Sequence, residues 1–250
     1  MLGRILDSTR ERLRTSGVVE HGTRSPSRGF AASLAAPGLQ IIAEIKRRSP
    51  SVGEIAPDLD PVGQAVAYQQ GGAAAISVLT EPEYFGGSVE DLQMVRQAVD
   101  LPVLRKDFII DMRQVEESRM IGADALLLIV AALDTELMAQ LLAECRRVEI
   151  EALVEAHDEI EADMAVAAGA RIIGINNRNL ETFETDLAVA ERIAPRLPRD
   201  GIRVGESGVS NVHGAARMAS AGYDAILVGE ALVRADDPVR LIEQLRATSQ

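Results

Sequence analysis

An acidic and a basic residue stand two positions apart where an apolar run ends: Glu44 and Lys46 close the run at residues 41–45. Residues two apart in a β-strand share a face, so the carboxylate and the ammonium should enter the same space. Taking an ion out of water costs several kcal/mol unless the ion is paired or used. The two residues are therefore either a structural ion pair or part of an active site.

Polar residues also follow four other apolar runs. Lys106 ends one run, Glu155 ends another, Asn176 and Arg178 follow a third, and Glu206 ends a fourth. Carboxylates and amines are the usual groups for general acid–base catalysis. Each has an ordinary alternative, such as a turn at Asn176. Five strand ends that all carry such groups favour a shared site, because buried charges without partners are expensive.

Two glycine-containing segments have the composition of a phosphate site. Ser207 and Gly208 follow one apolar run, and Gly229 and Glu230 follow the next. Small residues let backbone N–H groups approach an anion at the start of a helix. The side chain of Glu230 should then point away from the anion while its N–H donates. Either segment alone would more often be a tight turn, but the pair predicts phosphate binding.

Eight short apolar runs alternate with helix-period segments along the chain, which predicts eight βα units. Gly122, Gly169 and Gly222 close three of the helical segments, where a left-handed residue is needed. This order favours a closed parallel (β/α)8 barrel, the TIM barrel, over an open doubly wound sheet, which usually has fewer strands and a Gly-rich first turn. The runs are residues 41–45, 74–79, 103–104, 125–130, 152–154, 172–175, 202–204 and 225–228.

In such a barrel the C-terminal strand ends ring one mouth, where the active sites of this fold lie. The polar residues above would therefore converge. Arg105 and Asp107 flank Lys106, and the alternation of a strand turns them outward toward the helices, as a structural pair.

Length and composition bound the remaining possibilities. The chain of 250 residues is expected to be a single domain over 1–250, with residues 1–37 an N-terminal helical extension. A net charge of −12 argues against nucleic acid as a partner. The longest apolar run, 125–133, is too short to cross a membrane. We expect a cytoplasmic protein that is a monomer or a weak homo-oligomer and takes a small-molecule substrate.

The cysteine and histidine residues predict neither a disulfide nor a metal site. Cys145 is the only cysteine, and His21, His157 and His213 lack the spacing of a helical zinc pair. His157 stands near the mouth, where a loop or capping role is expected. No metal and no cofactor are expected.

Eight motifs are spread along the chain: A-E-I-K-R-R-S-P-S (43–51), T-E-P-E-Y-F-G-G-S (80–88), L-R-K-D-F (104–108), L-L-L-I-V (126–130), L-V-E-A-H (153–157), G-I-N-N-R-N-L (174–180), G-E-S-G-V (205–209) and L-V-G-E-A-L (227–232). Together they resemble the indole-3-glycerol phosphate synthase family of tryptophan biosynthesis. The resemblance runs from about residue 30 to residue 241, and L-R-K-D-F together with E-x-K-x-x-S-P is highly specific.

The resemblance implies a carboxy-lyase that needs no cofactor. Members of the family close the ring of 1-(2-carboxyphenylamino)-1-deoxyribulose 5-phosphate and release carbon dioxide and water. Lys106 matches the family's general acid and Glu155 its proposed base, with Glu44 and Lys46 as a second acid–base pair. Which lysine serves which step stays open.

The resemblance also assigns the binding residues. Asn176 and Glu206 would orient the intermediate, and Lys46 and Arg178 would bind the substrate carboxylate. The phosphate would be held by Ser49, Ser207, Gly208, Gly229 and Glu230. The slot for the aromatic ring would be formed by Pro50, Phe85, Phe108, Leu127, Leu180 and Leu227. Simple core packing is the alternative for the two phenylalanines.

One departure and two alternative functions accompany the resemblance. Many relatives carry Lys-Gly after S-P-S, whereas this chain has Val52 and Gly53, so a loop lysine over the phosphate is absent. The chain could instead be a noncatalytic barrel that binds phosphate esters, or an isomerase or lyase of a sibling phosphate-binding barrel family.

Overall fold

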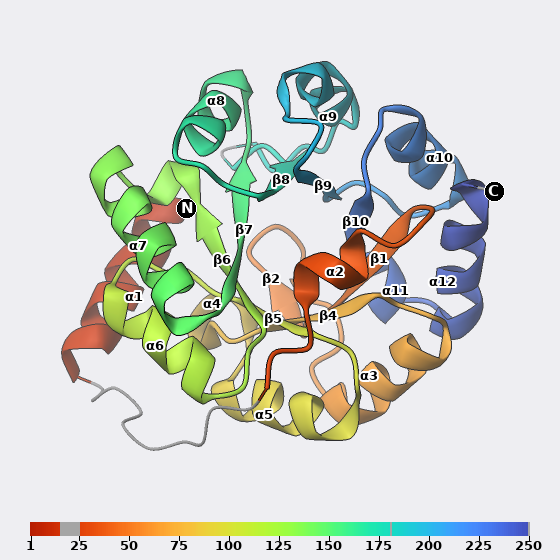
Figure 1. The fold of residues 1–250 in the computed structure, drawn as a ribbon. Helices are drawn as coiled ribbons and strands as arrows, with labels where there is room; N and C mark the ends of the chain where they lie inside the picture. The colour runs from red at the N-terminus through yellow and green to blue at the C-terminus, as the bar shows by residue number, and fades with distance from the viewer. Residues whose placement is uncertain (16–25, 181, 250) are drawn as a thin grey trace.

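A closed parallel barrel forms the centre of the molecule, as the computed structural model shows for residues 1–15, 26–180 and 182–249 (Figure 1). Within these residues the barrel strands pair in the order β1-β10-β9-β8-β7-β6-β5-β4, so the ring closes between β1 and β4. This confirms the predicted TIM barrel and excludes the open sheet. The strands are β1 (Gln40–Ile45), β4 (Ala75–Leu79), β5 (Val103–Lys106), β6 (Ala125–Ile129), β7 (Glu151–Ala156), β8 (Ile172–Asn176), β9 (Ile202–Glu206) and β10 (Ala225–Val228).

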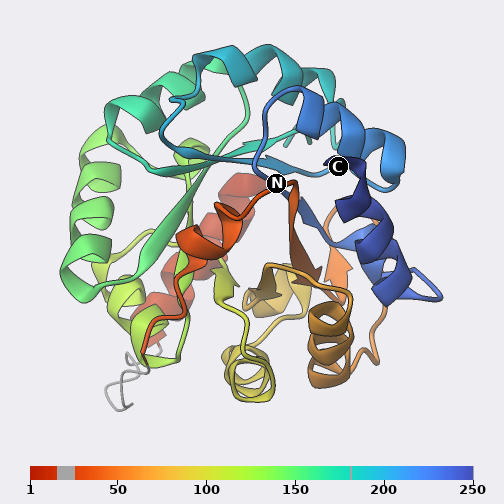
Figure 2. The same cartoon turned by 45° about the vertical axis from the view of Figure 1, so that its right-hand side comes forward.

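Helices follow every barrel strand and enclose the barrel (Figure 2). Most begin at an Asp, Asn or Ser whose side chain accepts a hydrogen bond from the first turn, as Asp111 does from Arg113. Gly122, Gly169 and Gly222 all have positive φ, which confirms the predicted left-handed ends. The enclosing helices are α3 (Pro61–Gln70), α5 (Val89–Ala98), α6 (Met112–Met120), α7 (Thr135–Val148), α8 (Glu159–Ala167), α9 (Ala188–Ile193), α10 (Val212–Ser220) and α12 (Pro238–Arg246).

Two strands end at the polar residues that the sequence places there. β5 ends at Lys106 and β9 at Glu206, and both charged side chains enter a polar cavity. Three short elements at the mouth were not expected: the hairpin of β2 (Arg48–Ser49) with β3 (Gly53–Glu54), and helix α4 (Pro82–Phe85).

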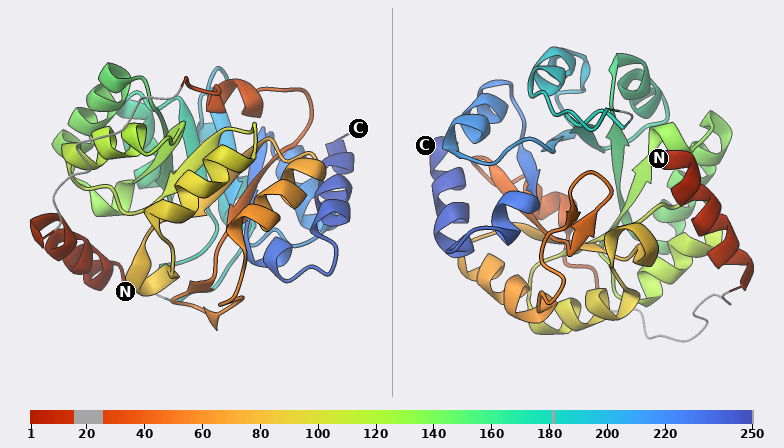
Figure 3. Two further views of the ribbon diagram at one scale, coloured as in Figure 1. Left: turned by 90° about the horizontal axis from the view of Figure 1, so that it is seen from below. Right: turned by 180° about the vertical axis from the view of Figure 1, so that it is seen from behind.

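The N-terminal extension contains two helices, which lie at opposite ends of the barrel (Figure 3). Helix α1 (Leu2–Thr15) borders the mouth, where Met1, Leu2 and Ile5 line the cavity. Helix α2 (Phe30–Leu34) lies at the other end. Its two fully buried side chains, Phe30 and Leu34, pack with the residues that fill the barrel interior: Ile42, Ala75, Leu104, Ala125, Leu127, Ile129, Leu153, Ile172, Val204, Ala225 and Leu227.

From the sequence we expect no membrane-spanning segment and no metal site. No helix in the described part of the chain is long and apolar enough to span a membrane. The same residues contain no group of three or more His, Cys, Asp and Glu side chains placed to hold a metal ion. Cys145 is buried in α7 with a free thiol, and His21 lies outside the described residues.

Candidate active site

A cavity of about 520 Å³ opens at the C-terminal ends of the barrel strands. It has a polar floor, an apolar wall and a rim of small residues. Every site residue predicted from the sequence lines it: Glu44, Lys46, Ser49, Pro50, Phe85, Lys106, Phe108, Leu127, Glu155, Asn176, Arg178, Leu180, Glu206, Ser207, Leu227, Gly208, Gly229 and Glu230.

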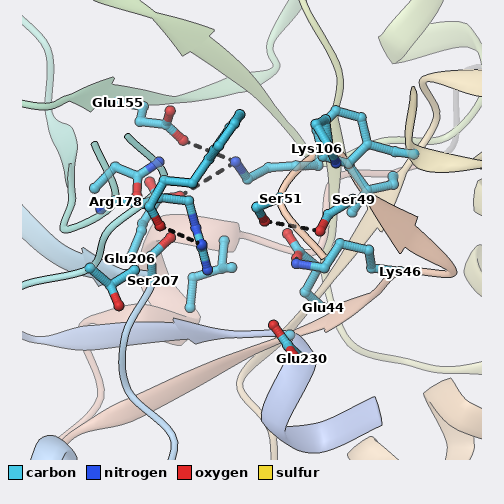
Figure 4. Close-up of a pocket in the computed structure, with 18 of the residues that line it drawn as sticks. Glu44, Lys46, Ser49, Ser51, Lys106, Glu155, Arg178, Glu206, Ser207 and Glu230 are labelled. Atoms are coloured by element: carbon cyan, nitrogen blue, oxygen red, sulfur yellow. Dashed lines mark hydrogen bonds and ion pairs between the residues drawn. The ribbon is translucent and has the colours of Figure 1, made fainter. Parts of the chain in front are cut away.

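Lys106 lies at the centre of the polar floor (Figure 4). Its Nζ atom is 2.9 Å from Oε2 of Glu155 and 3.5 Å from Oε2 of Glu206. Burial opposes the charge of this lysine, but Glu155, Glu206 and Glu44 outweigh it and raise the pKa of Lys106. In the unliganded cavity the amine is therefore protonated, which is the state a general acid needs.

The two carboxylates beside Lys106 differ in acidity. Burial opposes the charge of Glu155, yet Lys106 and His157 hold its pKa well below the usual range. Burial and the charge of Glu155 raise the pKa of Glu206 to about 8. At neutral pH one carboxyl is a base and the other is mostly a proton donor. Adjacent titratable groups with separated pKa values are typical of acid–base sites.

Glu44 and Lys46 form a second ion pair at the end of β1, with 2.8 Å between Nζ and Oε1. Both side chains point into the cavity, as the strand alternation predicts. A Cβ atom on Gly229 would lie 2.5 Å from Oε1 of Glu44 and 3.2 Å from Nζ of Lys46. The absence of a side chain on β10's end therefore makes room for this pair.

Residues beside Lys106 hold β5 from the outside. Arg105 donates from Nη2 to Asp107, over 3.1 Å, and from Nη1 to Glu117 on α6, over 2.7 Å. Both Arg105 and Asp107 are buried, and Asp107 also accepts from the hydroxyl of Thr80 at 2.7 Å. The predicted outward-facing pair is confirmed. Because it clamps the strand to its neighbours, the intervening Lys106 side chain is aimed inward.

The rim at the ends of β9 and β10 is formed by turn residues that line the cavity. Ser207 and Gly208 are consecutive residues with positive φ, 58° and 82°. Consecutive backbone N–H groups in such turns form concave donor surfaces. The carboxylate of Glu230 accepts from Nε of Arg234 at 3.0 Å. Ser49 contacts Ser51 through their hydroxyls, 3.2 Å apart.

The apolar wall contains two aromatic rings. Phe85 and Phe108 have centroids 6.1 Å apart at an interplanar angle of 38°. Both are half-buried and line the cavity, and Phe108 also packs against the apolar residues of the barrel interior. Pro50, Leu127, Leu180 and Leu227 complete the wall.

The end of β8 separates a cavity residue from a structural one. Asn176 lines the cavity and accepts from the backbone N–H of Arg178 at 3.1 Å. The guanidinium of Arg178 donates to the carbonyl of Phe183 at 3.0 Å, so this loop holds it at the cavity edge. Asn177 faces away and donates to the carbonyls of Glu206 and Ser207, which ties β8 to β9.

Sequence reasoning missed three contributions to the site. Residues of α1 reach the mouth, which no local pattern indicates. Gly174 lies beneath Glu206: a Cβ there would be 2.1 Å from Oε1 of Glu206. His157 has Nε2 at 3.3 Å from Oε1 of Glu155. Its position two residues after Glu155, just past the end of β7, was the available signal.

Comparison with known proteins gives a consistent assignment. A family model described as indole-3-glycerol phosphate synthase matches residues 5–245. Indole-3-glycerol phosphate synthase 2 of Streptomyces coelicolor is 51% identical over 220 residues, covering 88% of this chain and 85% of that protein. Indole-3-glycerol phosphate synthase of Mycolicibacterium smegmatis is also 51% identical over 220 residues, covering 88% and 81%.

More distant solved structures share the architecture. The 3-hexulose-6-phosphate synthase of Salmonella typhimurium superposes with a TM-score of 0.68 at 14% identity, covering 84% of this chain and 98% of that one. The thiamine phosphate pyrophosphorylase of Pyrococcus furiosus gives 0.63 at 17% identity, covering 88% and 96%. These two likenesses support the barrel fold alone, whereas the family match and the 51% identity establish that the chain belongs to the indole-3-glycerol phosphate synthase family.

Proposed function

We propose that this protein converts 1-(2-carboxyphenylamino)-1-deoxyribulose 5-phosphate to indole-3-glycerol phosphate, carbon dioxide and water, as a carboxy-lyase of tryptophan biosynthesis. The observation that carries the proposal is the Lys106 ammonium held between Glu155 and Glu206 in a cavity with an aromatic wall. The reaction needs an acid, a base and a place for a ring, and the cavity provides all three.

The first step is ring closure. The ring carbon that carries the carboxylate attacks the ketone carbon of the substrate, and Lys106 gives a proton to the ketone oxygen as it becomes a hydroxyl. The carboxylate then leaves as carbon dioxide, and its bonding electrons restore the aromatic ring. Lys46 and Arg178 are proposed to hold the carboxylate until it leaves.

The second step is loss of water. Glu155 removes the proton from the carbon next to the nitrogen while the hydroxyl leaves with a proton from an acid, which completes the indole double bond. Glu44 and Lys46 are proposed as the second acid–base pair. Asn176 and Glu206 are proposed to orient the intermediate.

Binding groups are assigned by the chemistry of the cavity walls. Ser49, Ser207, Gly208, Gly229 and Glu230 are proposed to hold the phosphate, the glycines and Glu230 through backbone N–H groups. Phe85 and Phe108 are proposed to hold the aromatic ring, with the four aliphatic residues of the wall. We also propose a cytoplasmic enzyme that acts as a monomer or a weak homo-oligomer.

The choice of cations supports the proposed roles. Lys46 and Lys106 are the only lysines of the chain, and every other side-chain cation apart from histidine is an arginine. An arginine stays protonated at any ordinary pH, whereas a lysine can give up its proton. Both lysines line the cavity, where the proposed reaction requires proton transfer.

The test is turnover of the defined substrate by the purified protein, followed by indole fluorescence. We expect activity in the wild type and a loss of about 100-fold or more in kcat for Lys106→Arg, which retains the charge between Glu155 and Glu206. Wild-type-like activity in this variant would overturn the role of Lys106. Tight binding of the substrate without turnover by the wild type would favour a noncatalytic barrel, and turnover of phosphoribosylanthranilate would favour a sibling isomerase.

A further inference from the structure

The imidazole of His157 lies between two carboxylates at the end of β7. Its Nδ1 is 3.0 Å from Oε2 of Glu161, and its Nε2 is 3.3 Å from Oε1 of Glu155. The backbone N–H of His157 donates to the same oxygen of Glu161 at 2.8 Å. The side chain is 12% exposed. The ring is therefore hydrogen-bonded at Nδ1, faces a carboxylate at Nε2 and is largely shielded from water.

The contact with Glu155 completes the surroundings of the proposed base. Oε2 of Glu155 faces the ammonium of Lys106, and Oε1 faces His157, so each carboxylate oxygen has its own nitrogen partner. Among the described residues Nε2 has no hydrogen-bond partner, so its contact with Glu155 is an ion pair of the protonated ring. Rotation of the carboxylate would break both contacts.

We propose that His157 is a positioning residue that fixes Glu155 opposite Lys106 and keeps it ionised. This inference rests on the function proposed above, in which Glu155 is the base. His157 is not among the residues that line the cavity, so it acts through Glu155 and is not itself a catalytic residue.

The charges around His157 support this role. Burial opposes protonation of the ring, but Glu155 and Glu161 outweigh it and raise the pKa of His157 to about 10. Glu155 faces the ring from β7, and Glu161 faces it from α8. Asp158 is occupied as the cap of α8, accepting from the backbone N–H of Glu161 at 2.8 Å.

Lys106 from β5 and Glu206 from β9 meet this cluster on the far side of Glu155. A second cation beside Glu155 explains why the two neighbouring carboxyl groups differ. Glu155 has Lys106 and His157 within 3.3 Å and stays ionised. Of the residues that the structure describes, Lys106 is the cation paired with Glu206, at 3.5 Å, and burial together with the charge of Glu155 raises the pKa of Glu206 to about 8. His157 thereby helps to keep the pKa of Glu155 below that of Glu206, so that Glu155 is the base and Glu206 the acid.

The test compares His157→Gln with His213→Gln, a matched control at an exposed position on α10. We expect His157→Gln to lower kcat about tenfold with KM changed less than twofold. The acid limb of the kcat/KM profile should move up by about one pH unit, because loss of a cation within 4 to 6 Å raises the pKa of a carboxyl group. Glu161→Gln should shift the limb in the same direction by less.

Two results would overturn the inference while leaving the function intact. One is an active wild type whose His157→Gln variant keeps the pH profile of His213→Gln. The other is a rise in KM alone, which would place His157 in substrate binding. Nitrogen NMR of the wild type adds a readout that does not depend on folding of a variant: His157 should remain protonated at pH 8, and a neutral ring there would contradict the proposal. An inactive wild type would instead count against the proposed function.

Discussion

Glu206 is expected to make the stability of the protein depend on pH. In the folded protein its pKa is about 8, whereas the ordinary value is 4.5. Between these two values the unfolded chain has released a proton that the folded protein still holds. The free energy of unfolding therefore falls as the pH rises through this window.

Glu206→Gln should remove this dependence, because glutamine does not ionise. Relative to the wild type, the variant should gain ~4 kcal/mol in free energy of unfolding between pH 5 and pH 8.5. Urea unfolding at three pH values measures the difference. Glu54→Gln, at an exposed position of the β2–β3 hairpin, serves as the control. Parallel curves for Glu206→Gln and the wild type would show that Glu206 does not titrate in this range.

A glycine sets the position of the same carboxyl group. A Cβ on Gly174 would lie 2.1 Å from Oε1 and 3.1 Å from Cδ of Glu206. Gly174→Ala should displace Glu206 from Lys106 and lower kcat at least tenfold, with a loss of stability of about 1–3 kcal/mol. Steady-state kinetics and urea unfolding together test this.

Gly205→Ala is the matched control for that prediction. Its Cβ would meet Sδ of Met218 at 3.0 Å, on the helix side of the barrel. The two variants add the same methyl group to neighbouring strands, so a comparable loss of stability is expected. If Gly205→Ala also lost tenfold in kcat, strain in the barrel and not displacement of Glu206 would be the cause.

At the level of elements, helix α1 is attached to the strand that carries Lys106. Arg12 donates from Nη2 to Oδ1 of Asp107 at 3.1 Å, and its Nη1 lies 3.9 Å from Glu81. Ser8 donates to Glu83 at 2.5 Å.

Arg12→Met should loosen α1 and raise KM several-fold, because α1 residues form part of the cavity wall, while kcat changes little. Arg4→Met, at an exposed position of the same helix, is the control, and equal KM values for the two variants would contradict the prediction.

The same contact shows what the sequence could and could not predict. The residues at the mouth were predictable because, in a parallel barrel, charged residues at the C-terminal ends of the strands all lie around the same opening. The position of α1 at the mouth could not be predicted, because it depends on a contact between residues 95 positions apart. The hairpin after β1 was missed for a similar reason: Arg47 forms an ion pair with Asp91 of α5, which holds the loop from a distance in sequence.

At the level of the whole molecule, stability and chemistry lie at opposite ends of the barrel. Phe30 and Leu34 of α2 fill one end with apolar side chains, and the charged cavity occupies the other. A buried aromatic ring stabilises the fold mainly because its apolar surface is removed from water. The buried ions of the mouth instead carry a desolvation cost. We propose that the chain nevertheless folds as one domain, since β-strands such as β1 run from one end to the other and belong to both.

Phe30→Ala tests this coupling. Loss of the ring from a fully buried site should cost about 3–5 kcal/mol, with less than a twofold change in kcat, and Phe30→Leu should cost less. Indole-3-glycerol phosphate at about 100 times its Kd should then raise the stability of wild type and Phe30→Ala alike, by about 2.7 kcal/mol, because a ligand at the mouth stabilises everything that unfolds with it. Calorimetry should show a single transition that the ligand moves as a whole. A transition that splits, with only one part moved by the ligand, would mean that α2 and the mouth belong to separately folding units.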